Sequence, residues 1–147
     1  MQRLILGPGP AWPKQPGDVF CDIRQYGNID VVHDLNNAWP FDDNLFIHVS
    51  AIHVVEHLND LVHFMDEAHR VLSPGGSLYI ETPLAGGDVD LEYADPTHKR
   101  CYRIHTFVNY FSPEGAAKFQ YTDKAWNFFH LKTRDNCIFV HAYPIKT

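Results

Sequence analysis

The stretch from residue 44 to residue 83 constrains the fold most, because it has the pattern of a strand, a helix and a second strand. Phe46 to Ile52 and Ser77 to Thr82 are largely apolar, which is typical of strands buried on both faces of a sheet. Between these runs, apolar residues recur at intervals of three and four, which predicts a helix with one apolar face. These residues are Leu58, Leu61, Val62, Met65, Ala68 and Leu72. The stretch therefore predicts a βαβ unit with two central parallel strands.

Both ends of this helix carry recognisable signals. Asn59 or Asp60 precedes the apolar repeat, and the side chain of either residue accepts hydrogen bonds from the free N–H groups of a first helical turn. The sequence Ser-Pro-Gly-Gly at 73–76 follows the repeat. Proline cannot extend a helix, and glycine adopts the left-handed conformation with which many helices end. We therefore expect the helix to stop at residues 73–76.

Three further strands are expected upstream, at Arg3 to Leu6, Asp18 to Ile23 and Ile29 to Leu35. The connection between the first two contains the proline-rich sequence PAWPKQPG. Parallel neighbours usually need about a dozen linking residues for a crossover helix, so we expect no normal helix in this connection.

The downstream part of the chain has a different character. Leu84 to Asp95 is rich in glycine and acid and is expected to form an active-site loop. Ile104 to Tyr110 is expected to be helical, and Ser112-Pro113-Glu114 is expected to open another helix. Trp126 to Leu131 and Cys137 to Tyr143 then predict a closing antiparallel hairpin.

Composition limits the class of protein. With 147 residues, 45% of them hydrophobic, the chain can bury one core without disulfides or metal ions, so we expect a single domain over residues 1–147. Cys21, Cys101 and Cys137 are odd in number and widely spaced, which favours free thiols and a cytoplasmic location. No apolar run reaches membrane-spanning length, so we expect no membrane partner. The formal net charge of −6 argues against bulk nucleic-acid binding.

Several segments resemble, in order, the class I S-adenosylmethionine-dependent methyltransferases, in particular their small bacterial and phage members. LILGPG resembles the glycine motif after the first strand, FCDI resembles the second strand with its ribose-binding acid, and VVHDLNNAWPF resembles the adenine-proximal segment. SAIHVVEHL, RVLSPGGSLYIETP and DPTHKRCY are similar to later elements of the family. The resemblance extends from Arg3 to Phe111.

This resemblance implies an α/β fold with a Rossmann-like, doubly wound and mostly parallel sheet that ends in a C-terminal antiparallel hairpin. Residues 1–83 would form the cofactor half, and residues 84–147 would form the acceptor loop and the closing hairpin. The implied activity is methyl transfer from S-adenosylmethionine, which releases S-adenosylhomocysteine, to an acceptor that is not identified.

Four residues are candidates for the cofactor site. Gly7 and Gly9 lack side chains, which allows the backbone to approach the methionine and ribose portions of a cofactor. The resemblance places Asp22 at the ribose hydroxyls and Asp34 near the adenine amino group. Each residue also has an ordinary explanation, because glycines and acids of this kind are frequent in turns and helix caps.

Three histidines are candidate catalytic residues. The resemblance places the segment with His53 and His57 beside the transferred methyl group, and His98 belongs to a later loop element. Methyl transfer is an in-line displacement, so the enzyme mainly aligns the reactants and removes a proton from a neutral oxygen or a protonated nitrogen. Imidazole suits that proton transfer. Capping a helix or binding backbone is the alternative role for each histidine.

Two other functions compete with this interpretation. Residues 53–57 read HVVEH, which matches the HxxEH motif of inverted zinc peptidases and indicates a zinc hydrolase as one alternative. The β-branched run before it places His53 at a strand end, away from a helix that could also carry His57, so we expect no metal site. The other alternative is a methyltransferase-like module that binds cofactor or a partner without catalysis. The aromatic C-terminal hairpin also suggests a homo-oligomer.

Overall fold

The computed structural model describes residues 1–87 and 92–147. Within these ranges, four strands are followed by a helix, a strand, two helices and two strands. A short 3₁₀ helix follows the fourth strand. The elements are β1 (Gln2–Leu6), β2 (Asp18–Asp22), β3 (Val31–Val32), β4 (Phe46–Ile52), η1 (Val55–His57), α1 (Leu61–Val71), β5 (Leu72–Pro83), α3 (Ile104–Phe111), α4 (Pro113–Phe119), β6 (Ala125–Arg134) and β7 (Cys137–Ile145).

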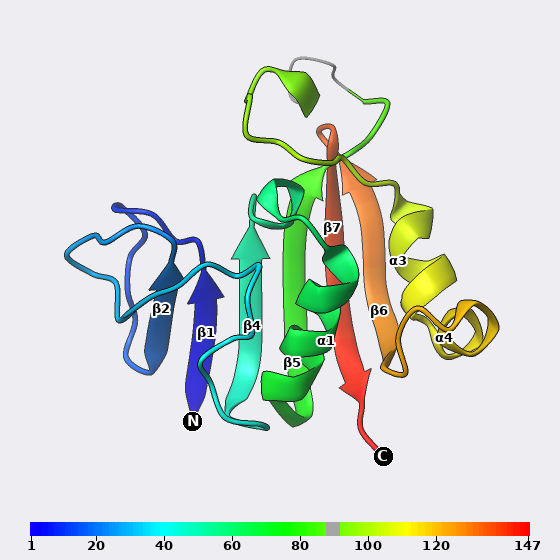
Figure 1. Ribbon diagram of the computed structural model, residues 1–147, viewed down its shortest axis with the longest axis horizontal. Coiled ribbons are helices and arrows are strands. Elements are labelled where there is room, and N and C mark those ends of the chain that lie inside the picture. The colour runs from blue at the N-terminus through cyan, green and yellow to red at the C-terminus, as the bar shows by residue number, and fades with distance from the viewer. Residues whose placement is uncertain (88–91) are drawn as a thin grey trace.

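Among the described residues the strands form one seven-stranded sheet in the order β3-β2-β1-β4-β5-β7-β6 (Figure 1). The strands from β3 to β5 pair in parallel, and β7 pairs antiparallel with both β5 and β6. The chain first runs outward from β1 to β3 and then continues on the other side with β4, so the order reverses between β1 and β4. The predicted Rossmann-like α/β sheet with a C-terminal antiparallel hairpin is confirmed. A sheet of this kind binds ligands beyond its carboxyl ends at the switch point.

The central βαβ unit follows the sequence prediction closely. β4 has the expected bounds. Asp60 caps α1, because its Oδ1 accepts hydrogen bonds from the backbone N–H groups of Val62 at 2.8 Å and of His63 at 3.2 Å. As predicted, the helix does not enter residues 73–76: α1 ends at Val71, and residues 72–76 already belong to the start of β5. Gly75 has a φ of +77° there, which allows the reversal that the glycine pair was expected to supply.

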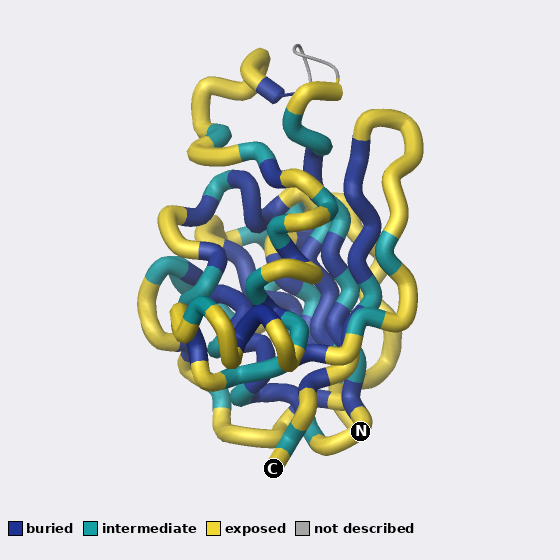
Figure 2. The backbone as a smooth tube through the Cα atoms, turned by 90° about the vertical axis from the view of Figure 1, so that its right-hand side faces the viewer, coloured by how far each residue is buried: buried dark blue, intermediate teal, exposed yellow. Residues whose placement is uncertain are grey.

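Alternating residues of the sheet form the core. The side chains of Val49, Ala51, Leu78, Ile80 and Val140 are 0% exposed. In Figure 1, α1 lies across the middle of the sheet, and its own apolar residues join the same hydrophobic cluster. Figure 2 shows the buried segments concentrated in the strands. Full burial of one such aliphatic side chain contributes about 1.5–3 kcal/mol to the stability of the folded state. The packed sheet therefore holds the strand ends in fixed positions.

Two of the predicted strands differ from the structure. β2 ends at Asp22, one residue early, and β3 has only two residues where seven were expected. The segment after β3 turns instead, because the side chain of Asp34 binds the backbone N–H of Asn36 at 3.0 Å. Local bonds from an Asx side chain compete with strand pairing. The proline-rich connection between β1 and β2, which is described throughout, contains no helix, as expected.

The C-terminal part contains the predicted helix pair and hairpin. Ser112 caps α4, because its Oγ accepts a hydrogen bond from the backbone N–H of Gly115 at 3.1 Å. β6 and β7 are longer than expected and are joined through Asp135 and Asn136, which have φ angles of 50° and 61°. Two consecutive left-handed residues are typical of a tight hairpin turn. None of the helices in the described parts of the chain is long and apolar enough to cross a membrane.

Candidate functional site

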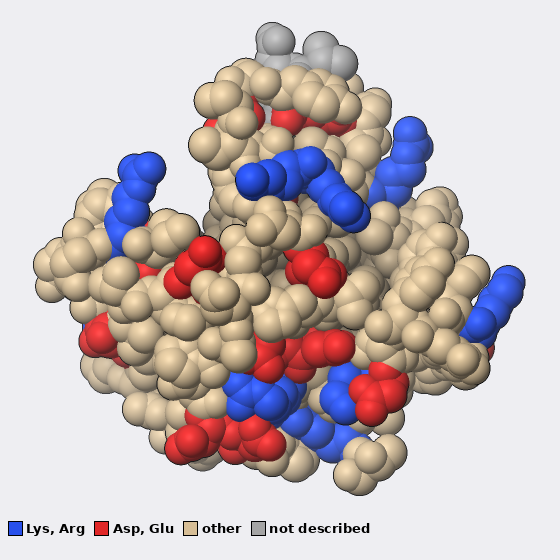
Figure 3. Space-filling view, in the orientation of Figure 1, with Lys and Arg blue, Asp and Glu red and all other residues tan. Residues whose placement is uncertain are grey.

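A cavity of about 610 Å³ opens at the carboxyl ends of β1, β2 and β4, beside the topological switch. Binding sites for small molecules and cofactors are usually roughly 300–1,000 Å³. In Figure 3 the surface is hollowed between the lobe at the left and the loops at the top, and neither charge sign dominates this face. The cavity is lined by Gly7, Asp22, Ile23, Arg24, Tyr26, His33, Asp34, Leu35, Asn36, His53, Val54, His57, Leu58, Pro96, Thr97 and Lys99.

The glycine loop forms the cavity floor next to β1. Gly7 has a φ of +60°, and a Cβ atom at this position would lie 2.6 Å from Cγ2 of Val54, so only glycine fits. Its backbone N–H donates to the carbonyl of Cys21 at 2.8 Å and ties the loop to β2. Gly9 also has a positive φ, of +64°, but a Cβ atom there would meet no atom within 4 Å. Gly7 lines the cavity and Gly9 does not.

Asp22 ends β2 at the cavity wall and is 8% exposed. Its Oδ2 accepts a hydrogen bond from the backbone N–H of Gly9 at 3.1 Å, and its Oδ1 accepts one from the backbone N–H of Arg24 at 3.0 Å. The carboxylate therefore holds two loops together. A carboxylate has about four acceptor positions, so it retains capacity for hydroxyl groups of a ligand.

Asp34 also lines the cavity and is partly buried. Its Oδ1 accepts from the backbone N–H of Asn36 at 3.0 Å and from the Asn36 side chain at 2.9 Å. This is the turn arrangement that the sequence offered as the ordinary explanation. A contact of Asp34 with a nucleobase stays a prediction.

His53 follows β4 directly, as the β-branched run predicted, and it has a left-handed φ of 53°. Its Nδ1 lies 3.3 Å from Oε1 of Glu56, and its Nε2 lies 3.5 Å from Oε1 of Glu81. The hydrogen bond with Glu56 and the charges of both carboxylates outweigh burial and raise the pKa of His53 above its ordinary value of 6.5. Backbone strain of this kind is often found at functional sites.

His57 ends the short helix η1 and lines the cavity. Its Nδ1 lies 2.9 Å from Oγ1 of Thr97, and its ring packs edge-to-face on the ring of His98 with centroids 4.8 Å apart. The structure thus brings two of the three predicted histidines into contact. His98 does not line the cavity, although its neighbours Thr97 and Lys99 do.

The HVVEH motif does not form the helical pair of ligands that a zinc peptidase needs. η1 contains only Val55 to His57, and His53 lies outside it at the end of the strand. In the described ranges, no group of three potential metal ligands contains both His53 and His57. This geometry gives the hydrolase alternative no support.

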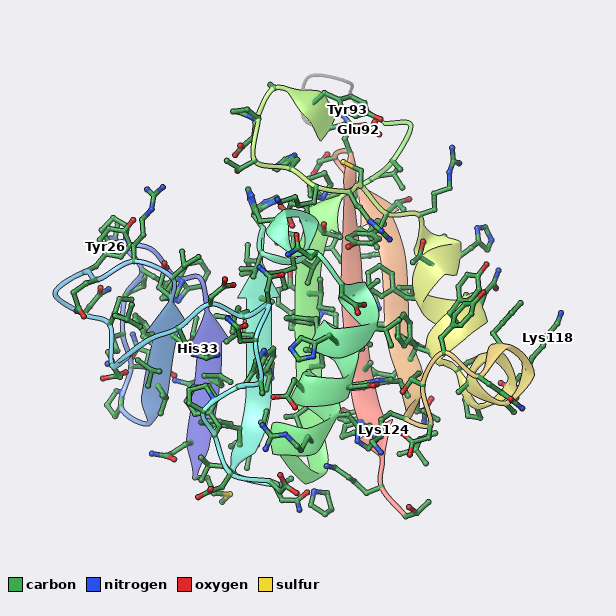
Figure 4. The ribbon with its side chains drawn as sticks, in the orientation of Figure 1. Tyr26, His33, Glu92, Tyr93, Lys118 and Lys124 are labelled. Carbon is green, nitrogen blue, oxygen red and sulfur yellow. The ribbon has the colours of Figure 1, made fainter. Side chains whose placement is uncertain are left out.

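Sequence reasoning missed several residues of the cavity wall. Tyr26 and His33 come from the segments that follow β2 and β3 (Figure 4). Nε2 of His33 is buried and has no hydrogen-bond partner among the described residues 1–87 and 92–147, which indicates a group that a bound ligand can satisfy. Its position next to Asp34 at the predicted end of a strand was the signal that could have identified it.

The predicted active-site loop, Leu84 to Asp95, falls partly outside the described residues, because 88–91 are not described. In the described part, Glu92 is 4% exposed and accepts hydrogen bonds from the backbone N–H groups of Gly86 and Gly87. The backbone N–H groups of Lys99 and Arg100 donate to the carbonyl of Glu56 at 2.7 Å and 3.3 Å. The loop that carries Thr97 and His98 is therefore anchored at the cavity rim.

Comparison with known sequences identifies the family that the chain resembles. Residues 19–80 match the family described as a methyltransferase domain. Two relatives are demethylmenaquinone methyltransferases, from Chlorobaculum tepidum (43% identity over 61 residues) and Chlorobaculum parvum (35% over 82 residues). The matches cover 42% and 56% of this chain, and only 25% and 31% of the relatives' own length.

Solved structures match over nearly the whole chain. A SAM dependent methyltransferase from Aquifex aeolicus has a TM-score of 0.68 at 14% identity, and the match covers 99% of this chain and 82% of that protein. A methyltransferase in complex with the Trm112 activator from Haloferax volcanii has a TM-score of 0.64 at 12% identity, with 97% and 81% covered. CalH, whose structure contains SAH, has a TM-score of 0.63 at 16% identity, with 99% and 51% covered. The resemblance to class I methyltransferases expected from the sequence is confirmed for the fold.

Proposed function

We propose that this chain, which has the class I methyltransferase fold and matches the methyltransferase-domain family over residues 19–80, transfers a methyl group from S-adenosylmethionine to an acceptor molecule. The observation that carries the proposal is the position of one cavity. It lies at the switch point of the sheet and is lined by both the loop glycine Gly7 and the strand-end acid Asp22. Cofactors of doubly wound sheets bind at this place.

The residues of the cavity fit such a cofactor. Gly7 exposes backbone at the end of β1, where a side chain could not be accommodated. Asp22 would accept hydrogen bonds from ribose hydroxyls while it holds the glycine loop through Gly9. Asp34 and the unpartnered Nε2 of His33 would face the base. The bound sulfonium would supply the methyl group, and the protein would align it with the acceptor.

The histidines lie on the acceptor side of this arrangement. His53 has a raised pKa and lies between the carboxylates of Glu56 and Glu81, so it suits orientation of an acceptor. His57 lines the cavity, and the side chain of Thr97 fixes its ring. We assign His57 the proton-transfer role, and His98 the role of supporting its ring.

Calorimetric titration with S-adenosylmethionine and S-adenosylhomocysteine tests the proposal. We expect micromolar binding to the wild-type protein and its loss in Asp22→Ala. The matched control is Asp42→Ala, which removes an exposed carboxylate outside the cavity. Absence of binding to the wild type would contradict the proposal. Binding without turnover over a broad acceptor screen would favour the alternative, a cofactor-binding module without catalysis.

The residues of the site indicate a broad class of acceptor. The matches to demethylmenaquinone methyltransferases cover less than a third of those proteins, so we propose their reaction type for this chain and leave their acceptor aside. An oxygen or nitrogen acceptor whose proton His57 can remove suits the site. A role in bulk nucleic-acid modification is not proposed, because the net charge is −6.

We further propose a single-domain chain of cytoplasmic location that forms a homo-oligomer through its C-terminal hairpin. The three cysteines are free thiols, as a reducing compartment favours. Phe129 and Tyr143 are 50% and 39% exposed and stack with ring centroids 4.5 Å apart. Light scattering checks the oligomer: Phe129→Ser should lower the measured mass, and a monomeric wild type at high concentration would contradict the proposal.

A further inference from the structure

We infer that Glu56, His57 and His98 form a binding site for a divalent transition metal ion such as Zn²⁺. Each of the three side chains offers one ligand atom, and these atoms lie within 4.8 Å of one another. Two imidazoles and one carboxylate are the ligand set of many catalytic zinc sites, in which a fourth position stays open for water or substrate. The sequence alone predicted no metal site, because it considered only His53 and His57 as a pair.

The hydrogen bonds of the two histidines prepare both rings for metal binding. The hydroxyl of Thr97 donates to Oδ1 of Asp95 at 2.7 Å, so its oxygen accepts from Nδ1–H of His57 at 2.9 Å. Nδ1 of His98 lies 2.9 Å from the backbone carbonyl of Glu92, which can only accept, so this nitrogen also carries the proton. In both rings Nδ1 is thus the protonated nitrogen and Nε2 is left as the ligand atom, although Nε2 of His98 also lies 3.9 Å from Oδ2 of Asp95. Metal-binding histidines are held in this way by a second hydrogen bond.

Glu56 provides the negative charge that a cation would neutralise. Its side chain is 0% exposed, and Oε2 accepts a hydrogen bond from Oγ1 of Thr82 at 3.1 Å. In the part of the chain that the structure describes, no lysine or arginine forms an ion pair with it, and His53 is its nearest basic group at 3.3 Å. A buried carboxylate is costly unless a cation or several hydrogen bonds compensate it.

The backbone brings the three ligands together without any metal. η1 places Glu56 and His57 side by side in sequence at the cavity rim. The carbonyl of Glu56 accepts the backbone N–H groups of Lys99 and Arg100, which fixes the loop that carries His98. The rings of His57 and His98 are then in edge-to-face contact. A metal ion would therefore bind to a largely preformed site, with little ordering of the loop.

A second group of potential ligands lies nearby, at His53, Glu81 and Cys137. There, both ring nitrogens of His53 face carboxylates, at 3.3 Å from Glu56 and 3.5 Å from Glu81. Both ring nitrogens of His53 are therefore already engaged by carboxylate oxygens. We therefore assign the metal to the first group.

The position of the site gives the metal ion a role in the reaction. His57 lines the cavity, so the open coordination position would hold an oxygen of the acceptor beside the transferred methyl group. Coordination would lower the pKa of that oxygen and assist proton loss. With the metal bound, Nε2 of His57 would be a ligand, so the acceptor's proton would pass to water and the metal would replace His57 in the proton-transfer role. This use depends on the proposed methyl transfer, whereas metal binding itself does not.

Titration of metal-free protein, purified without a nickel column, with Co²⁺ and Zn²⁺ tests the site. We expect one equivalent to bind, and the near-ultraviolet spectrum of bound Co²⁺ should lack a thiolate charge-transfer band. His57→Gln and His98→Gln should each weaken binding at least about tenfold. Cys137→Ser and His105→Gln, the latter at an exposed position of α3, are the controls and should bind as the wild type does.

Two results would overturn the inference. One is the absence of stoichiometric binding to the wild type, and the other is binding that is lost in Cys137→Ser and kept in His98→Gln. Calorimetry with S-adenosylhomocysteine on the same samples separates this inference from the proposed function. His98→Gln should retain that binding, which also checks that the variant is folded. Metal binding without any S-adenosylhomocysteine binding would contradict the proposed function and leave the metal site standing.

Discussion

Asp22 accepts a hydrogen bond from the backbone N–H of Gly9, with 3.1 Å between Oδ2 and the nitrogen. This bond joins the end of β2 to the loop after β1 across the first parallel pair of the sheet. The acid that the sequence assigned to a ligand therefore also shapes the loop that was expected to bind the same ligand. Loss of the charge of Asp22 should therefore affect both ligand binding and the conformation of the loop.

Asp22→Asn should weaken S-adenosylhomocysteine binding by roughly 10–100-fold, because hydrogen bonds to a charged group contribute about 1.5–3 kcal/mol. Calorimetric titration measures the change. Asp42→Asn is the control at an exposed carboxylate and should bind as the wild type does. An Asp22→Asn variant that is folded and binds with wild-type affinity would show that Asp22 only holds the loop after β1 in place.

Gly7→Ala and Gly9→Ala form a matched pair. Both place an alanine in the left-handed region, which costs about 1–2 kcal/mol. Only Gly7→Ala also brings a Cβ atom to 2.6 Å from Val54, so it should lower the free energy of unfolding further and disturb the cavity. Urea denaturation of the two variants measures the difference. Equal destabilisation would mean that Val54 moves away without cost.

His57→Ala should lower turnover and leave cofactor affinity nearly unchanged, because the proposed function gives His57, which lines the cavity, a role toward the acceptor. Kinetics with the identified acceptor give turnover, and calorimetry gives the affinity. Thr97→Val removes the hydroxyl that fixes the ring and should cause a smaller loss of the same kind. A parallel fall of turnover and affinity in His57→Ala would indicate a structural histidine instead.

The sequence predicts the central sheet well where one physical signal dominates. β4 is a largely apolar run, and its predicted bounds agree with the structure. β3 is different, because the side chain of Asp34 satisfies the backbone locally and ends the strand after two residues. The start of β5 was missed for a related reason. Ser73 bonds through its hydroxyl to the carbonyls of Asn44 and Phe46, which holds the glycine turn against the sheet.

The candidate site was predictable in part. Gly7, Asp22, Asp34, His53 and His57 follow strand ends, and the carboxyl ends of parallel strands meet at one edge, so these residues line one cavity. The contact between His57 and His98 depends on a loop whose position is set by backbone bonds to Glu56. Such bonds leave no pattern in the side-chain sequence, and for this reason the pair could not be predicted.

His69, which is buried on α1, should make the stability of the protein depend on pH. Its Nε2 donates to the carbonyl of Ile145 at 3.1 Å and links the helix to the end of β7. Burial is the largest influence and lowers the pKa of His69 below its ordinary value of 6.5, against the opposing effect of the bond to Ile145; the charges of Lys146 and Lys124 act in the same direction as burial. The folded state therefore binds fewer protons than the unfolded state at mildly acidic pH.

The sign of the effect follows from this difference. The contribution of His69 to stability is complete above about pH 6.5 and is lost as the pH falls below that value, because the unfolded state gains the proton first. His48 and His141 also have lowered pKa values and act in the same direction, whereas the raised pKa of His53 opposes them. Urea denaturation of the wild type should thus show falling stability from about pH 7.5 to about pH 5.5. His69→Gln can keep the bond to Ile145 without titrating, so its stability should fall less steeply over this interval. A slope equal to that of the wild type would mean that His69 is protonated as readily in the folded state as in the unfolded state.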